Sequence, residues 1–369
     1  MDRNEDLLKV GMLALGVSLG LVVCGGTASA LVLELGGTSP HTALPIGEGP
    51  SEEGPSDIGP SDIAPSDIGP SETGPAETGA PGSAQVPGDC ITAPNSCGFP
   101  DGTNTGVPSG TALRSVPGQV SSGPGWYYNS TGNDVIVTAD GTVLSGLYIP
   151  CNLVISASNV TVQDVRVVTG GYFGISLTHT TGVTIEDSTI SGQNATTGRV
   201  GSAIDDVYGD STGIVIKNNN IFQFKTGVQI STGLIAGNYI HDPGYIHGDH
   251  TNGIFVDGTT EPLTIYGNTV FNNLGQTDDI SLDASSSGQD VANKFVVDNL
   301  LAGGAYCIYG GAARNDRTSN IVIEDNEFGR LYYPDGGQYG PAAYVDLQQA
   351  GNVWSGNVWS GTGDPAMVG

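Results

Sequence analysis

The stretch 241–252 holds the side chains of this chain that are best suited to proton transfer. It reads His-Asp-Pro-Gly-Tyr-Ile-His-Gly-Asp-His-Thr-Asn and contains three of the five histidines in the sequence. Histidine changes its charge near neutral pH, and histidine with aspartate also forms metal sites. We therefore regard His247, Asp249 and His250 as candidate catalytic residues. In the alternative interpretation, Asp249 and Asn252 cap a turn and one histidine packs into the core.

Short apolar segments, such as Gly-Ile-Phe-Val at Gly253 and Asp-Ile-Ser-Leu at Asp279, carry acidic residues at related places. If the isoleucine points inward and the segments stack as neighbouring strands, Asp257 and Asp283 lie roughly 5 Å apart on the outward side. Asp205 and Asp279 are expected on the same side. Stacked carboxylates repel, so they need a cation, a shared proton or a functional role. A solvated acidic face is the alternative.

Three kinds of chemistry fit these residues. Paired carboxylates can hydrolyse a glycosidic bond, one as acid and the other as base or nucleophile. Asp257 and Asp283 could instead bind Ca2+, which would acidify a uronate substrate for elimination. That elimination needs a base, for which the candidates are His250, Lys225, Arg314 and Arg317. Alternatively, aromatic residues bind sugar rings without catalysis.

The candidate residues fall into two groups. The catalytic candidates are His247, Asp249, His250, Asp257, Asp279 and Asp283. The substrate-binding candidates are Asp205, Phe255, Tyr309, Arg314, Arg317 and Tyr344.

A repeated phrase of eight residues must supply the elements that position these side chains. It is clearest over 214–221, Ile-Val-Ile-Lys-Asn-Asn-Asn-Ile. Its third and eighth places are large and apolar in every copy, and its fifth is always Asp, Asn or Gly. Repetition at intervals of 18 to 31 residues is the signature of a solenoid. The nine copies begin at Thr142, Val160, Val183, Ile214, Gly233, Leu263, Lys294, Ile321 and Asn352.

The places within the phrase predict a strand, a sharp turn and a second strand. Apolar and polar residues alternate at period two, which is typical of strands with one buried side. Asp, Asn and Gly tolerate left-handed backbone angles, so the fifth place is expected to bend. The sixth place is Asn in the last six copies, which predicts a ladder of side-chain hydrogen bonds along the stack. Those residues are Asn219, Asn238, Asn268, Asn299, Asn326 and Asn357.

A further strand follows in most copies, for example Gly-Ile-Ser-Leu at Gly174, Cys-Ile-Tyr-Gly at Cys307 and Tyr-Val-Asp-Leu at Tyr344. With these strands the sequence resembles the right-handed parallel β-helix superfamily, which includes pectate lyases and polygalacturonases. The expected fold is all-β, a right-handed parallel β-helix of about nine coils in a domain over 142–369. One such fold hosts many chemistries, so the resemblance predicts the fold more strongly than the activity.

In detail, the resemblance implies a carbohydrate-active protein without fixing the reaction. Thr277-Asp278-Asp279 is similar to an acidic motif of polygalacturonases, but the basic Arg-x-Lys motif of that family is missing. Pectate lyases place a basic residue beside their Ca2+-binding acids, whereas the outward places here are poor in Arg and Lys. The Cys-Gly-Phe-Pro-Asp start at Cys97 and the His-Gly-Asp-His loop resemble secreted actinobacterial β-helix proteins.

The expected function is therefore that of a polysaccharide lyase or glycoside hydrolase. A non-catalytic glycan-binding or adhesive surface module is the alternative, and a structural wall or spike protein is a third. Eleven basic residues against 38 acidic ones give a net charge of −27. That balance argues against nucleic acid as a partner, because phosphates require Lys and Arg. The expected partner is an extracellular polysaccharide.

The N-terminal part predicts export. An apolar run begins at Val10, and Ala28-Ser29-Ala30 fits a signal-peptidase site, so residues 1–36 are a signal peptide or a retained anchor. Residues 37–88 carry Pro-Ser-Asp repeats typical of an extended, disordered linker. The expected location is secreted or anchored at the cell surface, with membrane contact only through an uncleaved N-terminal segment.

Residues 89–141 are expected to lead into the solenoid and cover its open end. Trp126, Tyr127 and Tyr128 would form an apolar cap. Cys90 and Cys97 flank a Pro-Asn-Ser turn, and in an exported chain such a pair predicts a disulfide. Cys151 and Cys307 are too many copies apart to pair and are expected to be single thiols, buried or half-buried.

Overall fold

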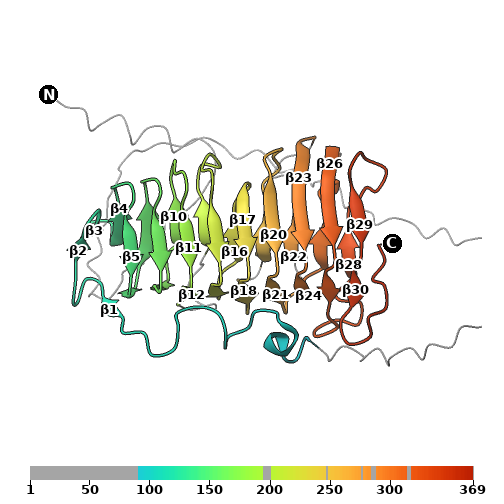
Figure 1. The fold of residues 1–369 in the computed structure, drawn as a ribbon, viewed down its shortest axis with the longest axis horizontal. Helices are drawn as coiled ribbons and strands as arrows, with labels where there is room; N and C mark the ends of the chain where they lie inside the picture. The colour runs from blue at the N-terminus through green and yellow to red at the C-terminus, as the bar shows by residue number, and fades with distance from the viewer. Residues whose placement is uncertain are drawn as a thin grey trace, which may run out of the picture. The chain divides into compact units, whose positions relative to one another are not determined.

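The computed structural model describes residues 90–193, 201–246, 248–275, 277–283, 288–313 and 317–368. Over these ranges the chain is a parallel β-solenoid, in which three sheets run side by side along the stack of coils (Figure 1). Its one helix in these ranges is the short 3-10 helix η1 (Pro94–Cys97). The predicted signal segment, 1–36, and linker, 37–88, lie outside the described residues. No helix of the described residues is both long and apolar enough to cross a membrane.

Each coil contributes one strand to each of three sheets, which we call sheets A, B and C. Sheet C has nine strands: β5 (Val143–Ser145), β8 (Thr161–Gln163), β11 (Thr184–Glu186), β14 (Val215–Lys217), β17 (Gly233–Ala236), β20 (Leu263–Tyr266), β23 (Asp290–Val297), β26 (Arg317–Glu324) and β29 (Val353–Ser355).

Sheet A follows sheet C after a sharp turn and has ten strands: β1 (Arg114–Ser115), β6 (Leu147–Ile149), β9 (Arg166–Thr169), β12 (Thr189–Gly192), β15 (Asn220–Phe222), β18 (Tyr239–His241), β21 (Thr269–Asn272), β24 (Leu300–Gly303), β27 (Glu327–Phe328) and β30 (Val358–Trp359).

Sheet B has eleven strands: β2 (Ser122–Gly123), β3 (Trp126–Asn129), β4 (Asp134–Val137), β7 (Asn152–Ile155), β10 (Phe173–Leu177), β13 (Ser202–Asp206), β16 (Thr226–Gln229), β19 (Asn252–Phe255), β22 (Asp278–Ser281), β25 (Tyr306–Tyr309) and β28 (Gly340–Ala343).

The repeated phrase forms the corner between sheets C and A. Every copy supplies one strand of sheet C, and the fifth residue of every copy has a positive φ, between 47° and 65°. The third-place residues from Leu144 to Ile323 are fully buried, and the eighth-place residues from Ile149 to Phe328 are buried as well. The predicted strand, turn and strand are thus confirmed. The right-handed sense and the number of nine coils stay predictions.

The predicted asparagine ladder is present. The Asn219 backbone N–H and side-chain amide both donate to Asn238 Oδ1, at 2.9 and 3.0 Å. Asn238 bonds Asn268 in the same way, and the pattern continues through Asn299 and Asn326 to Asn357. Each side chain also donates to a backbone carbonyl of the preceding coil, and four of the six donate to a carbonyl of their own corner as well. The ladder therefore satisfies polar groups that the tight turns bury.

The last strand of sheet B differs from the sequence prediction. The apolar pattern at Tyr344 predicts a strand there, but β28 ends at Ala343 and Ala342 pairs with Ile308. Tyr344 turns the chain out of the sheet with a φ of 56°. Val345 still packs against the core, which explains why the segment looks like a strand in the sequence.

The N-terminal end of the solenoid is covered by a hairpin. Strands β3 and β4 pair antiparallel, and β4 then pairs in parallel with β7. Trp126 is buried in the main core and Tyr128 packs against that core, but Tyr127 points out and is 45% exposed. Two of the three predicted cap aromatics therefore contact the core, because alternation along β3 turns the middle one outward.

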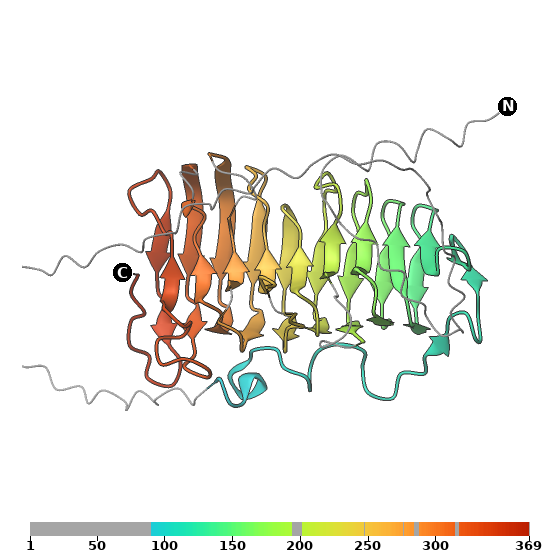
Figure 2. The ribbon, with the colours of Figure 1, turned by 180° about the vertical axis from the view of Figure 1, so that it is seen from behind.

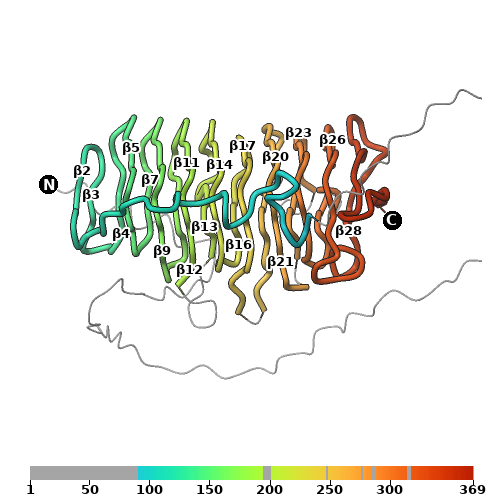
Figure 3. Tube along the Cα trace, turned by 60° about the horizontal axis from the view of Figure 1, so that its bottom comes forward, coloured from blue at the N-terminus to red at the C-terminus, as the bar shows by residue number. Residues whose placement is uncertain are grey.

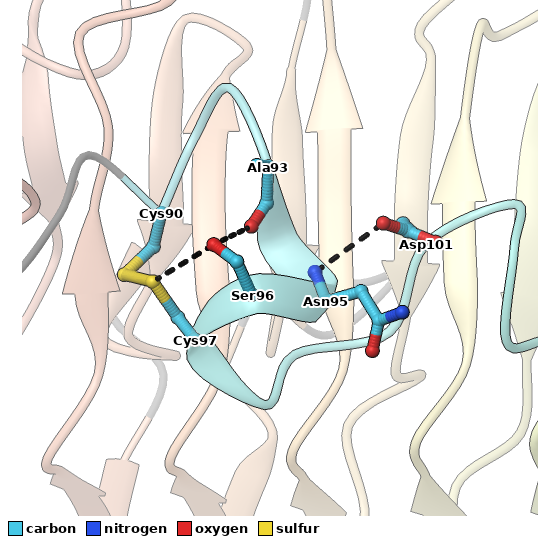
Figure 4. The surroundings of a disulfide bond; sticks show 6 residues. All are labelled: Cys90, Ala93, Asn95, Ser96, Cys97 and Asp101. Carbon is cyan, nitrogen blue, oxygen red and sulfur yellow. Dashed lines mark hydrogen bonds between the residues drawn. A yellow bond between two sulfur atoms is a disulfide. The ribbon is translucent and has the colours of Figure 1, made fainter.

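Residues 90–113, which we call the strap, lie against the outer face of sheet A (Figures 2 and 3). Ile91 and Phe99 of the strap pack with Phe271, Leu300 and Ala302 of the sheet. The predicted disulfide joins Cys90 to Cys97 across η1 (Figure 4). Beside it the Asn95 backbone N–H donates to Asp101, and the Ser96 hydroxyl to Ala93 O. Cys151 and Cys307 are buried thiols, as predicted.

Candidate functional site

The outward face of sheet B carries rows of side chains set by the strand register. One row contains Asp205, Phe255, Ser281 and Tyr309, because Asp205 pairs with Gln229, Gln229 with Phe255, Phe255 with Ser281 and Ser281 with Tyr309. A second row, three residues earlier in each strand, places Asp278 beside Tyr306. Tyr306 and Tyr309 lie on one face although they are three residues apart, because Cys307 and Ile308 between them both turn into the core.

Three aspartates of one coil lie in or just after strand β22, and we call Asp278, Asp279 and Asp283 the acid cluster. Asp278 and Asp279 have no exposed surface, and Asp283 is 5% exposed. Burial raises the pKa of Asp278 to about 9, and the negative charges of Asp283 and Asp279 add to that shift. The nearby Ser281 hydroxyl opposes that shift. Asp278 is therefore protonated at neutral pH.

Asp279 does not lie on the outward face, so the sequence prediction for this side chain is wrong. Asp279 and Ile280 are both fully buried, as are Cys307 and Ile308 in the next strand. Burial raises the Asp279 pKa well above its ordinary value, and the nearby Cys307 thiol and backbone N–H groups of sheet A oppose that shift. Strict alternation fails here because two consecutive residues turn inward where sheet B leaves the corner with sheet A.

Four tyrosines flank the acid cluster on its C-terminal side, and we call Tyr306, Tyr309, Tyr339 and Tyr344 the tyrosine row. Their ring centroids follow one another at 5.9 Å from Tyr339 to Tyr306, 5.6 Å to Tyr309 and 5.2 Å to Tyr344. Tyr339 and Tyr344 are 65% and 52% exposed. Burial and then the charge of Asp278 raise the pKa of Tyr309, so its hydroxyl stays protonated.

The predicted histidine loop joins β18 to β19. Asp249 is buried and accepts a hydrogen bond from the Ile246 backbone N–H at 3.1 Å, while its own N–H donates to Ile246 O. Asp249 thus caps a turn, which was the alternative interpretation of this residue. His250 is exposed. His247 lies outside the described residues.

Asp257 and Asp283, the residues predicted to bind Ca2+, follow strands β19 and β22. The last paired residues of β19 and β22 are Phe255 and Ser281, and Asp257 and Asp283 each follow two residues later. Asp257 is half-buried and accepts a hydrogen bond from the Gly258 N–H. Within the described ranges, no group of three or more His, Cys, Asp or Glu side chains is arranged to hold a metal ion.

The remaining substrate-binding candidates are spread over the molecule. Asp205 lies three strands from the acid cluster, about 14 Å away at the usual strand spacing, and burial raises its pKa to about 6. Arg317 begins β26 in sheet C, where its Nε donates to Asp290 at 2.7 Å. Arg314 lies outside the described residues. Phe255, Tyr309 and Tyr344 lie on or beside the sheet B face.

Asp278 and Tyr339 are the site residues that the sequence pattern does not select. The adjacent pair Asp278-Asp279 could have indicated the site. Successive strand residues point to opposite sides, so two adjacent acids before an apolar strand residue cannot both be solvated on the same side of the strand. No comparable signal identifies Tyr339, which belongs to the irregular segment between β27 and β28. Comparison of the chain with protein-family models, curated proteins and solved structures finds no match.

Proposed function

We propose that the outward face of sheet B binds an extracellular polysaccharide and that Asp278 and Asp283 hydrolyse its glycosidic bonds. The observation that carries the proposal is the pairing of two carboxyl groups, one of which has its pKa raised to about 9. Glycosidases need one carboxyl that is protonated at the working pH and a second that is ionised. The secreted or cell-surface location predicted from the N-terminal sequence agrees with such a substrate.

The two carboxyl groups have different roles in this reaction. Asp278 donates its proton to the glycosidic oxygen as the bond from that oxygen to the anomeric carbon breaks. Asp283 acts as the base that takes a proton from the attacking water, or as the nucleophile that bonds the anomeric carbon. Asp278 has no exposed surface, so the substrate reaches it only when its covering groups move aside.

Hydrolysis agrees better with the cluster than elimination does. Elimination needs a base that can take a proton from carbon, and a carboxyl group that is protonated at neutral pH, such as that of Asp278, does not supply one. The raised pKa of Tyr309 makes its phenolate a minor species at neutral pH. The resemblance of Thr277-Asp278-Asp279 to the acidic motif of polygalacturonases supports the same choice. A Ca2+-dependent lyase that uses Asp257 and Asp283 remains the competing reaction.

A polysaccharide panel tests the proposal. Each glycan is incubated with wild type, Asp278→Asn, Asp283→Asn and Asp164→Asn, with Ca2+ and with EDTA. New reducing ends measure hydrolysis, and absorbance near 235 nm reports the unsaturated products of elimination. Asp164 is the matched control because it is a turn residue with positive φ at the corner of sheets C and A, a position that Asn also tolerates.

The proposal predicts reducing ends without absorbance near 235 nm, unaffected by EDTA. Both cluster variants should lose at least 100-fold in rate, and Asp164→Asn should match wild type. Unsaturated products that form only with Ca2+ would show that the reaction is elimination and not hydrolysis. Equal turnover by wild type and Asp278→Asn would refute the assigned roles.

A non-catalytic glycan-binding module is the second candidate, and the tyrosine row favours it. Exposed tyrosine rings present flat apolar faces with a polar tip, which suits sugar rings. On this hypothesis wild type retains a glycan without cleaving it. Tyr339→Ala and Tyr344→Ala reduce that retention, while Asp278→Asn leaves it unchanged.

A further inference from the structure

A groove on the outer face of sheet A is separate from the sheet B face. It has a volume of about 600 Å3, a size that suits a short saccharide. We call it the sheet A groove. Leu113 and Ser115 border it, and its floor and remaining wall come from β6, β9, β12 and β15 and the residues that follow them: Tyr148, Arg166, Val168, Phe222, Gln193 and Gln223.

Beyond this groove, the strap and stacked aromatic rings cover the outer face of sheet A. The Gly106 N–H donates to Asn218 O at 2.9 Å, and the Val107 N–H donates to Thr189 Oγ1 at 3.1 Å. A Cβ on Gly106 would lie 2.7 Å from Thr189 Oγ1, so only glycine allows this close approach. Past β15, Phe222 stacks on His241 at 5.2 Å. The open part of the face is thus confined to the first strands of sheet A.

The charge of the groove is opposite to that of the molecule. The chain carries a net charge of −27, yet the groove lining contains no Asp or Glu and one cation, Arg166. Arg166 is exposed and forms no ion pair with any residue in the described ranges, whereas Lys217 and Arg317 pair with Glu186 and Asp290. A guanidinium without an acidic partner, beside aromatic rings and amides, is suited to bind an anionic group on a ligand.

We propose that the sheet A groove binds an acidic saccharide. A carboxylate or sulfate of the ligand pairs with the Arg166 guanidinium, a sugar ring packs on Tyr148 or Phe222, and the amides of Gln193 and Gln223 bond hydroxyl groups. This site is additional to the proposed function and does not depend on it, since its residues belong to another sheet.

Binding of four trisaccharides by titration calorimetry at low salt tests this proposal. The probes are a galacturonate trimer, its methyl ester, a sulfated galactose trimer and the neutral galactose trimer. The proteins are wild type, Arg166→Gln, Tyr148→Ala, Asp278→Asn and Arg114→Gln. Arg114 is the matched control because it is an exposed arginine of sheet A that does not line the groove.

The expected result is binding of at least one anionic trimer at least tenfold more tightly than its neutral counterpart, weakened by added salt. Arg166→Gln should lower that affinity at least tenfold and Tyr148→Ala at least threefold, whereas Arg114→Gln and Asp278→Asn should not change it. The carboxylate and sulfate probes show which anion is preferred. No binding of either anionic trimer at millimolar concentration, or equal loss in Arg166→Gln and Arg114→Gln, would overturn the proposal.

Discussion

At the scale of single residues, the carboxyl groups of the acid cluster are the most unusual feature of the molecule. A carboxylate with no exposed surface is unfavourable unless it is protonated, paired or hydrogen bonded. In the acid cluster, Asp278 and Asp279 lie in one coil and neither has any exposed surface. Burial and mutual repulsion both favour the protonated form, so folding and proton binding are linked.

Asp278 therefore makes stability depend on pH. Its pKa rises from 3.8 to about 9 on folding, so its stabilising contribution is complete below about pH 4 and is lost as pH rises through 9. Asp278→Asn should remove this part of the dependence, and the variant should gain stability relative to wild type between pH 5 and 9. Urea unfolding across that range measures the effect, with Asp164→Asn as control. A constant difference between Asp278→Asn and wild type at all pH values would contradict the prediction.

Lys294 is a buried cation that holds the corner between sheets B and C. Its Nζ donates to Ser231 O at 3.0 Å, to Thr259 Oγ1 at 3.1 Å and to Glu261 O. Lys294→Met should lower the free energy of unfolding by about 1–3 kcal/mol, because buried acceptors lose their donor. Lys217→Met is the control: that side chain forms a partly exposed pair with Glu186, so its loss should cost less than about 1 kcal/mol. Similar losses in both variants would argue against this role.

At the scale of elements, the asparagine ladder ties neighbouring coils together. The Asn268 side chain donates to Ile235 O, Tyr266 O and Asn299 Oδ1, and its oxygen accepts from Asn238. Asn268→Ala leaves several of these buried groups without partners, so it should cost about 2–4 kcal/mol. Denaturant unfolding provides the measurement, and exposed Asn104→Ala, in the strap, is the control. A ladder variant as stable as that control would mean that the turn geometry alone holds the corner.

The strap is held to sheet A by apolar contacts, and its disulfide closes only a short loop. Cys90→Ser with Cys97→Ser should lower stability by about 2 kcal/mol, the entropic value for a loop of this length. Amide hydrogen exchange should increase at Phe271 and Leu300 under the strap and stay unchanged at Val162 in sheet C. Faster exchange throughout the solenoid would show instead that the strap is needed for the whole fold.

At the scale of the whole molecule, a net charge of −27 makes repulsion a general force against the folded state. Salt shortens the range of that repulsion from about 30 Å at 0.01 M to about 8 Å at 0.15 M. The unfolding temperature should therefore rise by several degrees over this interval in NaCl. A matched CaCl2 series separates screening from binding: added stabilisation that disappears in Asp257→Asn and Asp283→Asn would support the predicted Ca2+ pair. An unfolding temperature that is flat in NaCl would contradict the prediction.

The sequence by itself determined the solenoid and its corners, because these depend on local chemistry repeated many times. Each fifth place is Asp, Asn or Gly and each has a positive φ, and the six asparagines bond in sequence order. The Cys90–Cys97 disulfide is local as well, because its two cysteines are 7 residues apart in the sequence. Features of this kind depend only on the backbone preferences of single residues and on the period of the repeat.

Only the tertiary structure decided where the side chains of the sites point. Alternation predicts Asp279 on the outward face, but two consecutive residues turn inward at that corner and bury it. The strand at Tyr344 is displaced to Gly340–Ala343, and the tyrosine row takes Tyr339 from an irregular segment. The sheet A groove exists because Leu113 and Ser115 lie beside strands β6, β9, β12 and β15, some of which are far away in the chain. These features depend on contacts between distant residues, which periodicity does not encode.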